Sequence, residues 1–125
     1  MLIKTVSGLN IYQMASELSA EVEMLVKHVS FYWENVEVKQ VIRSSSSVQA
    51  NIAEGFSQRF YPKKFIHYLN IALGSSDESQ NHLKKLKLNG KIDGEVGEDM
   101  IRKYKNLSVR ILNFINYLRK RSELD

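Results

Sequence analysis

The sequence predicts an all-α fold, an antiparallel up-down-up-down four-helix bundle formed by a single domain over residues 1–125. Three observations support this prediction. Apolar residues recur every three or four positions over four long segments, and no segment shows the strict alternation typical of a half-buried strand. The breaks between these segments are short and contain residues that end helices. Long helices joined by short turns pack against their chain neighbours in opposite directions.

The first helix is expected to start after Ser7 or Asn10 and to end at about Val29. Charged residues lie on the side of this helix opposite its apolar residues. Three aromatic residues follow at positions 31–33, and we expect the burial of their rings to fix one end of the bundle. The apolar positions of the first helix are Ile11, Ala15, Leu18, Val22, Leu25, Val26 and Val29.

The second helix is expected to run from about Glu34 to Glu54, and it contains four consecutive serines at residues 44–47. Serine makes helix formation less favourable than alanine does by only a few tenths of a kcal/mol. Its hydroxyl can bond to a carbonyl one turn earlier, and its small size lets another helix approach. We therefore interpret the serine run as a tight helix contact rather than a flexible linker.

The end of the second helix is expected at Gly55, where glycine can adopt the left-handed conformation that closes a helix. Glu54 stands just before it, although a carboxylate near a helix C-terminus opposes the macrodipole. Three explanations remain open from the sequence. Glu54 is exposed to solvent, forms an ion pair with Arg43 or Arg59, or joins a polar network with the next helix.

The third helix is expected from Pro62 to Leu88, because proline is accepted in the first turn of a helix. Gly74, Ser75 and Ser76 make it thin at mid-length, which suggests a close crossing with the serine run. Asn89-Gly90 and a polar turn to residue 97 separate it from a fourth helix, from about Glu95 to Arg121. The core side of the fourth helix holds Met100, Tyr104, Leu107, Ile111, Phe114, Ile115 and Leu118.

The sequence favours a cytoplasmic protein that has no catalytic activity. The chain has no cysteine, no signal-peptide pattern and no apolar run near the ~20 residues of a membrane span. It contains no Glu-x-x-His pair, no phosphate-binding glycine loop and no nucleophile elbow, so we expect no metal, no cofactor and no catalytic residues. Each of the three histidines, His28, His67 and His82, is interpreted as a surface or half-buried residue rather than a ligand.

The positive charge is concentrated in the second half of the chain. Residues 1–62 carry five Lys/Arg and six Asp/Glu, whereas residues 63–125 carry thirteen and eight. Such asymmetry suggests an anionic partner, most often nucleic acid. A solvated helix face is also often rich in Lys and Arg, so the pattern alone does not decide. The candidate nucleic-acid-binding residues are Lys84, Lys85 and Lys87, then Lys103, Lys105, Arg110, Tyr117 and Arg121. A basic stripe within an arc of about 80° on the fourth helix is formed by Lys103, Asn106, Arg110, Asn113, Tyr117 and Arg121.

More apolar residues are present than one bundle needs. Tyr68 and Ile71 lie on a flank of the third helix, and Val109 and Leu112 lie away from the core side of the fourth. Extra apolar stripes on a bundle usually meet another subunit.

Two sequence blocks carry a resemblance to a known family. The block VQANIAEG at residues 48–55, followed by FIHYLNIALGS at residues 65–75 and Glu78, resembles the four-helix-bundle family of S23 or 23S rRNA intervening-sequence proteins. The resemblance covers nearly the whole chain, from about Ile11 to Leu118. The family usually has Phe-Pro after the first helix, and this chain lacks that proline. The motif positions, which we interpret as architectural, are Arg43, Asn51, Glu54, Gly55, Gly74 and Ser75.

The resemblance implies a homo-oligomeric ring, typically a pentamer. Members of the family are encoded within intervening sequences of large-subunit ribosomal RNA genes. Similar bundle proteins accompany the reverse transcriptases of diversity-generating retroelements, where they bind nucleic acid and the polymerase. We therefore expect a non-enzymatic, oligomeric accessory protein that binds RNA or DNA, with RNA favoured over DNA. The alternative is an oligomeric scaffold for a protein partner such as a polymerase, with no nucleic-acid role and no membrane contact.

Overall fold

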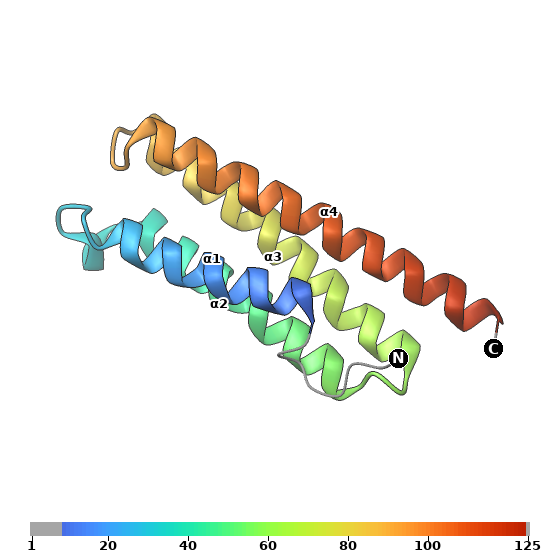
Figure 1. The fold of residues 1–125 in the computed structure, drawn as a ribbon. Coiled ribbons are helices and arrows are strands. Elements are labelled where there is room, and N and C mark those ends of the chain that lie inside the picture. Colours follow the sequence, from blue (N-terminus) through green and yellow to red (C-terminus); the bar gives the residue numbers. More distant parts are fainter. Residues whose placement is uncertain (1–8, 125) are drawn as a thin grey trace.

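The computed structural model describes residues 9–124, with side chains as far as residue 122. It contains four α-helices and one short 3-10 helix, and no strand lies within this range (Figure 1). The prediction of an all-α fold is therefore confirmed for the described residues. In chain order the elements are α1 (Asn10–Val26), η2 (Tyr32–Glu34), α2 (Val36–Ser57), α3 (Pro62–Leu88) and α4 (Gly94–Leu124).

The helix ends follow from local chemistry. The Val38 amide donates to the Asn35 side-chain oxygen at 3.0 Å, which caps the start of α2. Helix α3 spans the predicted residues and closes at Gly90, whose φ of 67° lies in the left-handed region. The Lys91 amide then donates to the Leu86 carbonyl at 2.9 Å, so this turn satisfies a carbonyl that the helix leaves free.

The contacts between α3 and α4 pair the two helices in opposite order. Phe65, near the start of α3, packs edge-on against Phe114 in the second half of α4, with ring centroids 5.5 Å apart. Lys87, at the end of α3, donates to Glu98 near the start of α4 at 2.6 Å. As residue numbers rise along α3 they fall along α4, so the two helices lie side by side in opposite directions (Figure 1).

The serine run forms the predicted tight contact between α2 and α3. The hydroxyl of Ser44 lies 2.7 Å from that of Ser79, and the hydroxyl of Ser47 lies 2.9 Å from that of Ser75. Ser44 and Ser79 are completely buried. Ser44 also donates to the Val41 carbonyl at 3.3 Å, as expected for a serine within a helix. Small side chains thus let the two helices meet through hydrogen bonds at mid-length.

Gly55 and Gly74 differ from their predicted roles. Gly55 does not end α2 in a left-handed turn, because α2 continues to Ser57. A Cβ added at Gly55 would lie 2.9 Å from the Phe65 ring and 3.0 Å from the Tyr68 Cβ, so glycine is needed for the approach of α3. A Cβ added at Gly74 would meet nothing within 4 Å. Gly74 therefore plays no part in the crossing of α2 and α3.

The aromatic residues after α1 are not buried as predicted. Phe31 is 67% exposed and Trp33 is 58% exposed, while Tyr32 is half-buried. The rings of Phe31 and Tyr32 pack edge-on against Trp33, and Phe31 has a φ of 52°, which is rare for a bulky side chain. The rings of Phe31 and Tyr32 contact Trp33 instead of filling the end of the core, so this end of the bundle presents aromatic surface.

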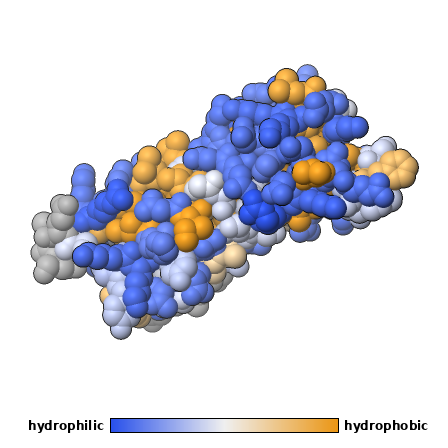
Figure 2. All heavy atoms as spheres, turned by 180° about the vertical axis from the view of Figure 1, so that it is seen from behind, coloured by the Kyte–Doolittle hydropathy of each residue, from blue (hydrophilic) through white to orange (hydrophobic). Residues whose placement is uncertain are grey.

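The surface combines hydrophilic side chains with separate apolar patches (Figure 2). Ile71, Val109 and Leu112 are exposed, as expected for residues outside the core, and Tyr68 is half-buried. No helix in the described part of the chain is both long and apolar enough to cross a membrane.

Candidate nucleic-acid interface

Two of the predicted basic residues form ion pairs with carboxylates on neighbouring helices. The ammonium group of Lys85 lies 3.6 Å from Glu37 of α2, and that of Lys87 lies 2.6 Å from Glu98 of α4. The hydrogen bond from Lys87 holds the pKa of Glu98 below its usual value. Both lysines lie in the last turn of α3, as predicted, but their charges are partly balanced within the protein.

Lys103 is also paired, although the sequence grouped it with the exposed basic stripe of the fourth helix. Its ammonium group lies 3.2 Å from Glu21 of α1 and 3.3 Å from Asp99 one turn earlier in α4. Hydrogen bonds to both carboxylates, that of Glu21 first, raise the pKa of Lys103. Lys103 therefore connects α4 to α1 rather than facing an outside anion.

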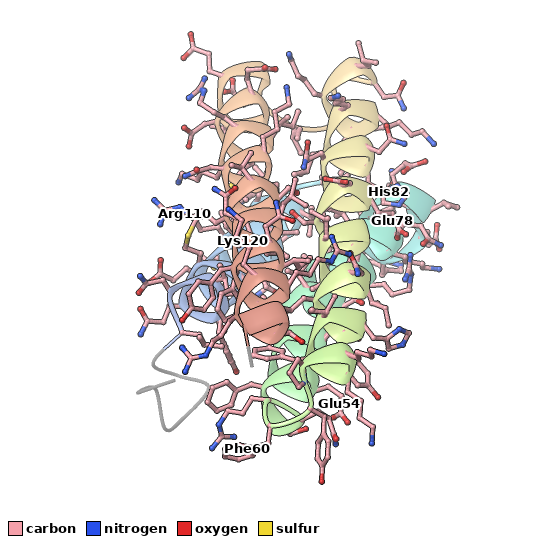
Figure 3. The ribbon with its side chains drawn as sticks, turned by 90° about the vertical axis from the view of Figure 1, so that its right-hand side faces the viewer. Glu54, Phe60, Glu78, His82, Arg110 and Lys120 are labelled. Carbon is pink, nitrogen blue, oxygen red and sulfur yellow. The ribbon has the colours of Figure 1, made fainter. Side chains whose placement is uncertain are left out.

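The remaining predicted cations are exposed. Lys84, Lys105 and Arg110 form no ion pair with any residue whose side chain the structure describes. Arg110 projects from α4 on the side of the molecule opposite Glu78 and His82 (Figure 3). These cations are available to a phosphate group without breaking an internal pair.

Tyr117 and Arg121 form a small aromatic and basic unit near the end of α4. The Tyr117 ring stacks on Phe114 with an interplanar angle of 11°, and it remains 48% exposed. Arg121 donates to the Tyr117 hydroxyl at 2.9 Å, so the guanidinium group and the phenol are held together. The arrangement offers both a cation and a ring to one ligand.

Two long stretches of the chain contain no carboxylate side chain. No Asp or Glu occurs in residues 55–76 or 100–122, and the contact between Phe65 and Phe114 places the two stretches side by side. Together they carry ten of the 18 Lys and Arg residues of the chain. These are Arg59, Lys63, Lys64, Arg102, Lys103, Lys105, Arg110, Arg119, Lys120 and Arg121.

The turn between α2 and α3 is a second basic region, which the sequence analysis treated only as a connection. The guanidinium carbon of Arg59 lies 4.3 Å from the centroid of the Phe56 ring and 4.7 Å from that of Phe60. The ammonium group of Lys64 lies 4.9 Å from the centroid of Tyr61. Phe60 projects outward at this turn (Figure 3). The absence of Asp and Glu from residues 55–76 was the signal that could have identified it.

Several family-motif residues hold α2 against α3. Arg43 of α2 forms an ion pair with Glu78 of α3. Asn51 donates from its side-chain amide to the Ser47 carbonyl at 2.9 Å and to the Ser47 hydroxyl at 3.0 Å. Ser47 in turn bonds to Ser75 at 2.9 Å. Arg43, Asn51 and Ser75 thus have contacts that fit an architectural role, as does Gly55 through its close approach to α3.

Glu54 does not form the ion pair considered from the sequence. Arg43 pairs with Glu78, and Arg59 donates to the Phe56 carbonyl at 3.2 Å while packing on rings. Glu54 is exposed, and among the described residues its backbone carbonyl, not its carboxylate, accepts a bond from Ser57. Like Gly74, Glu54 is a family-motif residue that is exposed to solvent.

His82 of α3 lies between two carboxylate side chains. His82 Nδ1 lies 2.6 Å from Glu37, and His82 Nε2 lies 3.8 Å from Glu78. The two carboxylates contact different ring nitrogens, so the three side chains do not converge on one point. In the described part of the chain no group of three His, Asp or Glu residues is arranged to hold a metal ion.

Comparisons with known proteins agree with the resemblance noted in the sequence. The model of the 23S rRNA-intervening sequence protein family matches residues 7–113. A solved structure of a protein with unknown function from the S23 ribosomal protein family of Bacteroides thetaiotaomicron is similar, at 28% identity and a TM-score of 0.76. This match covers 84% of the present chain and 97% of the Bacteroides chain. A comparison with curated protein sequences found no match. The chain therefore belongs to the 23S rRNA-intervening sequence protein family.

Proposed function

We propose that this protein is a non-enzymatic, oligomeric accessory protein that binds nucleic acid, with RNA preferred over DNA. The observation that carries the proposal is the exposed face of α4. Residues 100–122 contain no carboxylate, and the exposed Lys105 and Arg110 of α4 form no internal ion pair among the described side chains. Contacts of Lys and Arg with phosphates supply most of the affinity in non-specific binding.

The preference for RNA rests on the groups that accompany these cations. Asn106 and Asn113 are exposed on α4, and amides can bond to both the 2′-hydroxyl group and the base edge of RNA. Tyr117 is exposed and held by Phe114, so it offers a ring on which an unpaired base can stack. Duplex DNA has neither the 2′-hydroxyl group nor unstacked bases.

The oligomeric part of the proposal is a ring of up-down-up-down bundles, with five copies, the number that the family resemblance implies. The exposed apolar residues Ile71, Val109 and Leu112 supply surface that a second copy would cover. A ring would repeat the basic face several times. Weak contacts at each copy would then add up through avidity.

Binding of the purified protein to structured RNA and to duplex DNA tests the proposal, with the mass of the assembly measured in the same samples. If each complex forms four phosphate contacts, RNA affinity should fall about 100-fold between about 50 and about 200 mM salt. We expect salt-sensitive RNA binding by a ring. Absence of RNA binding at the lower salt concentration would contradict the nucleic-acid role, and a monomeric mass would contradict the ring.

A second candidate function is a scaffold for a protein partner, favoured by the exposed aromatic surface beside η2. Phe31, Trp33 and Val36 are 67%, 58% and 66% exposed. Binding through these side chains would be largely insensitive to salt, because it would bury apolar surface rather than displace counterions. Loss of partner binding in Trp33→Ala, with RNA binding intact, would support this function over the first.

A further inference from the structure

We propose that the turn between α2 and α3 is a binding site for unpaired bases of single-stranded RNA. The site consists of Arg59, Phe60, Tyr61, Lys63 and Lys64, and we refer to it as the turn site. The inference rests on the proposed nucleic-acid function and specifies the class of ligand. The turn site lies outside the residues that the sequence analysis selected.

The two rings of the turn site are exposed and held in place. Phe60 is 79% exposed and Tyr61 is 61% exposed, although large aromatic side chains usually avoid such contact with water. Arg59 packs on the rings of both Phe56 and Phe60 and is fixed by its bond to the Phe56 carbonyl. Because Phe56 is buried, this contact orients the exposed Phe60 ring before any ligand arrives.

A shallow depression with a lining more apolar than polar lies next to Lys64, whose ammonium group packs on the Tyr61 ring. Gln58, Lys63, Lys64, His67 and Tyr68 line it, and no carboxylate contributes to its wall. Lys63 and Lys64 are exposed and form no ion pair among the described side chains. A concave surface with two ammonium groups, an amide and an imidazole can hold a phosphate group and the edge of a base next to the stacking rings.

A series of ring contacts runs from Phe56, on which Arg59 of the turn site packs, to the basic end of α4. Phe56 contacts Phe65 with centroids 6.4 Å apart, Phe65 contacts Phe114 at 5.5 Å, and Phe114 stacks on Tyr117 at 6.1 Å. Arg121 bonds to Tyr117 at the far end of this series. The α2–α3 turn and the end of α4 also lie at the same end of the molecule (Figure 1). A flexible strand can therefore contact both places.

The chemistry favours a single strand over the alternatives. Bases inside a duplex are stacked on each other and leave no face for Phe60 or Tyr61, whereas unpaired bases stack readily on aromatic side chains. A partner protein would match apolar rings, but it would not require a stretch of 22 residues, 55–76, without one carboxylate. An anionic lipid surface would match both features, and binding to vesicles distinguishes it from RNA. The exposed aromatic surface at Phe31 and Trp33 shows the contrast, because no cation packs on those rings in the described structure.

The double variant Phe60→Leu/Tyr61→Leu tests the inference in the full-length assembly. Leucine keeps an apolar side chain, although a shorter one, and has no aromatic face. The probe is a single-stranded RNA that carries 2-aminopurine, whose fluorescence is quenched by stacking, and the same RNA annealed to its complement. Trp33→Ala is the matched control, because it removes an aromatic side chain of similar exposure at the other end of the bundle. The mass of each variant confirms that assembly is unchanged.

We expect the wild type to bind the single strand more tightly than the duplex and to quench the probe. The double variant should lose at least about tenfold in single-strand affinity, since each stacked base contributes about 5- to 150-fold. Trp33→Ala should bind as the wild type does. Equal RNA affinity in the double variant would overturn the turn site while leaving the proposed function in place. No RNA binding by the wild type would overturn both, and binding of the wild type only to anionic vesicles would do the same.

Discussion

Because α2 and α3 approach closely at Gly55, we expect alanine to destabilise the protein at Gly55 and to stabilise it at Gly74. Gly74→Ala replaces an exposed glycine within α3, and its new methyl group meets nothing within 4 Å. The substitution should stabilise the protein by about 0.5–1 kcal/mol through helix propensity alone. At Gly55 the same gain is opposed by overpacking, which costs about 1–3 kcal/mol.

The structure indicates that the overpacking term is larger at Gly55. The methyl group would lie 2.9 Å from the Phe65 ring, 3.0 Å from the Tyr68 Cβ and 3.3 Å from the Phe65 carbonyl oxygen. The Phe65 ring is completely buried and contacts Phe56 and Phe114, so it cannot move aside cheaply. We therefore expect Gly55→Ala to lose a net of about 1–2 kcal/mol.

Urea unfolding followed by far-UV circular dichroism measures both changes, at one protein concentration because assembly contributes to stability. The unfolding midpoint of Gly55→Ala should fall while that of Gly74→Ala rises. The mass of each variant identifies any effect on assembly separately. An unchanged or higher midpoint for Gly55→Ala would refute the close-packing argument.

The remaining predictions concern buried hydroxyl groups. The Tyr104 hydroxyl is buried without a hydrogen-bond partner in the described structure. The nearby Ser45 hydroxyl donates to the Ile42 carbonyl at 3.1 Å instead. Tyr104→Phe should therefore raise the free energy of unfolding by about 1 kcal/mol, and a loss of that size would reveal a bond to Ser45. Burial raises the pKa of Tyr104, so stability falls as pH rises above the tyrosine pKa of about 10 in the unfolded chain. Tyr104→Phe should reduce this alkaline loss in urea titrations compared at neutral and alkaline pH, and an identical loss would contradict the assignment. Finally, Ser44→Ala and Ser79→Ala should each cost about 0.5–1.5 kcal/mol, with the double variant costing less than their sum because both remove the same bond. Strict additivity in a double-mutant cycle would contradict the bond.

Much of the fold could be predicted because helix periodicity is a local property. The limits of α3 follow from Pro62 and from Asn89-Gly90, and the structure has the same limits. The role of Gly55 could not be predicted in the same way. Whether a glycine ends a helix or admits a neighbour depends on where that neighbour lies. From the sequence we expected Gly55 to end the helix, which is a local rule. In the structure the packing of Phe65 against α2 requires the glycine instead.

The aromatic turn after α1 was mispredicted for a related reason. Large apolar rings are usually buried, and this preference led to the expectation for residues 31–33. In the structure Phe31 and Tyr32 pack against Trp33 and leave much of their surface exposed. Ring burial depends on space at the end of the bundle, which periodicity does not describe.

The candidate interface was predicted in part. The stripe on α4 follows from helical spacing, and Arg110 and Arg121 are exposed there. The pairing of Lys103 with Glu21 could not be foreseen, because the two residues are 82 positions apart and meet only when α1 packs on α4. The turn site was missed because Arg59 was considered only as a partner for Glu54, not as a cation packed on rings.

The central claim is that cations without an ion pair among the described side chains form the nucleic-acid surface of α4. The salt dependence of RNA affinity tests it most directly, because its slope counts phosphate contacts. Two triple glutamine variants are compared with the wild type. The open triple replaces cations that form no ion pair among the described side chains, which are Lys105, Arg110 and Arg121. The paired triple replaces cations that do form one, which are Lys85, Lys87 and Lys103. We expect the slope to decrease by at least about 2 in the open triple and by less than about 1 in the paired triple. An equal decrease in both variants, or none in the open triple, would contradict the claim.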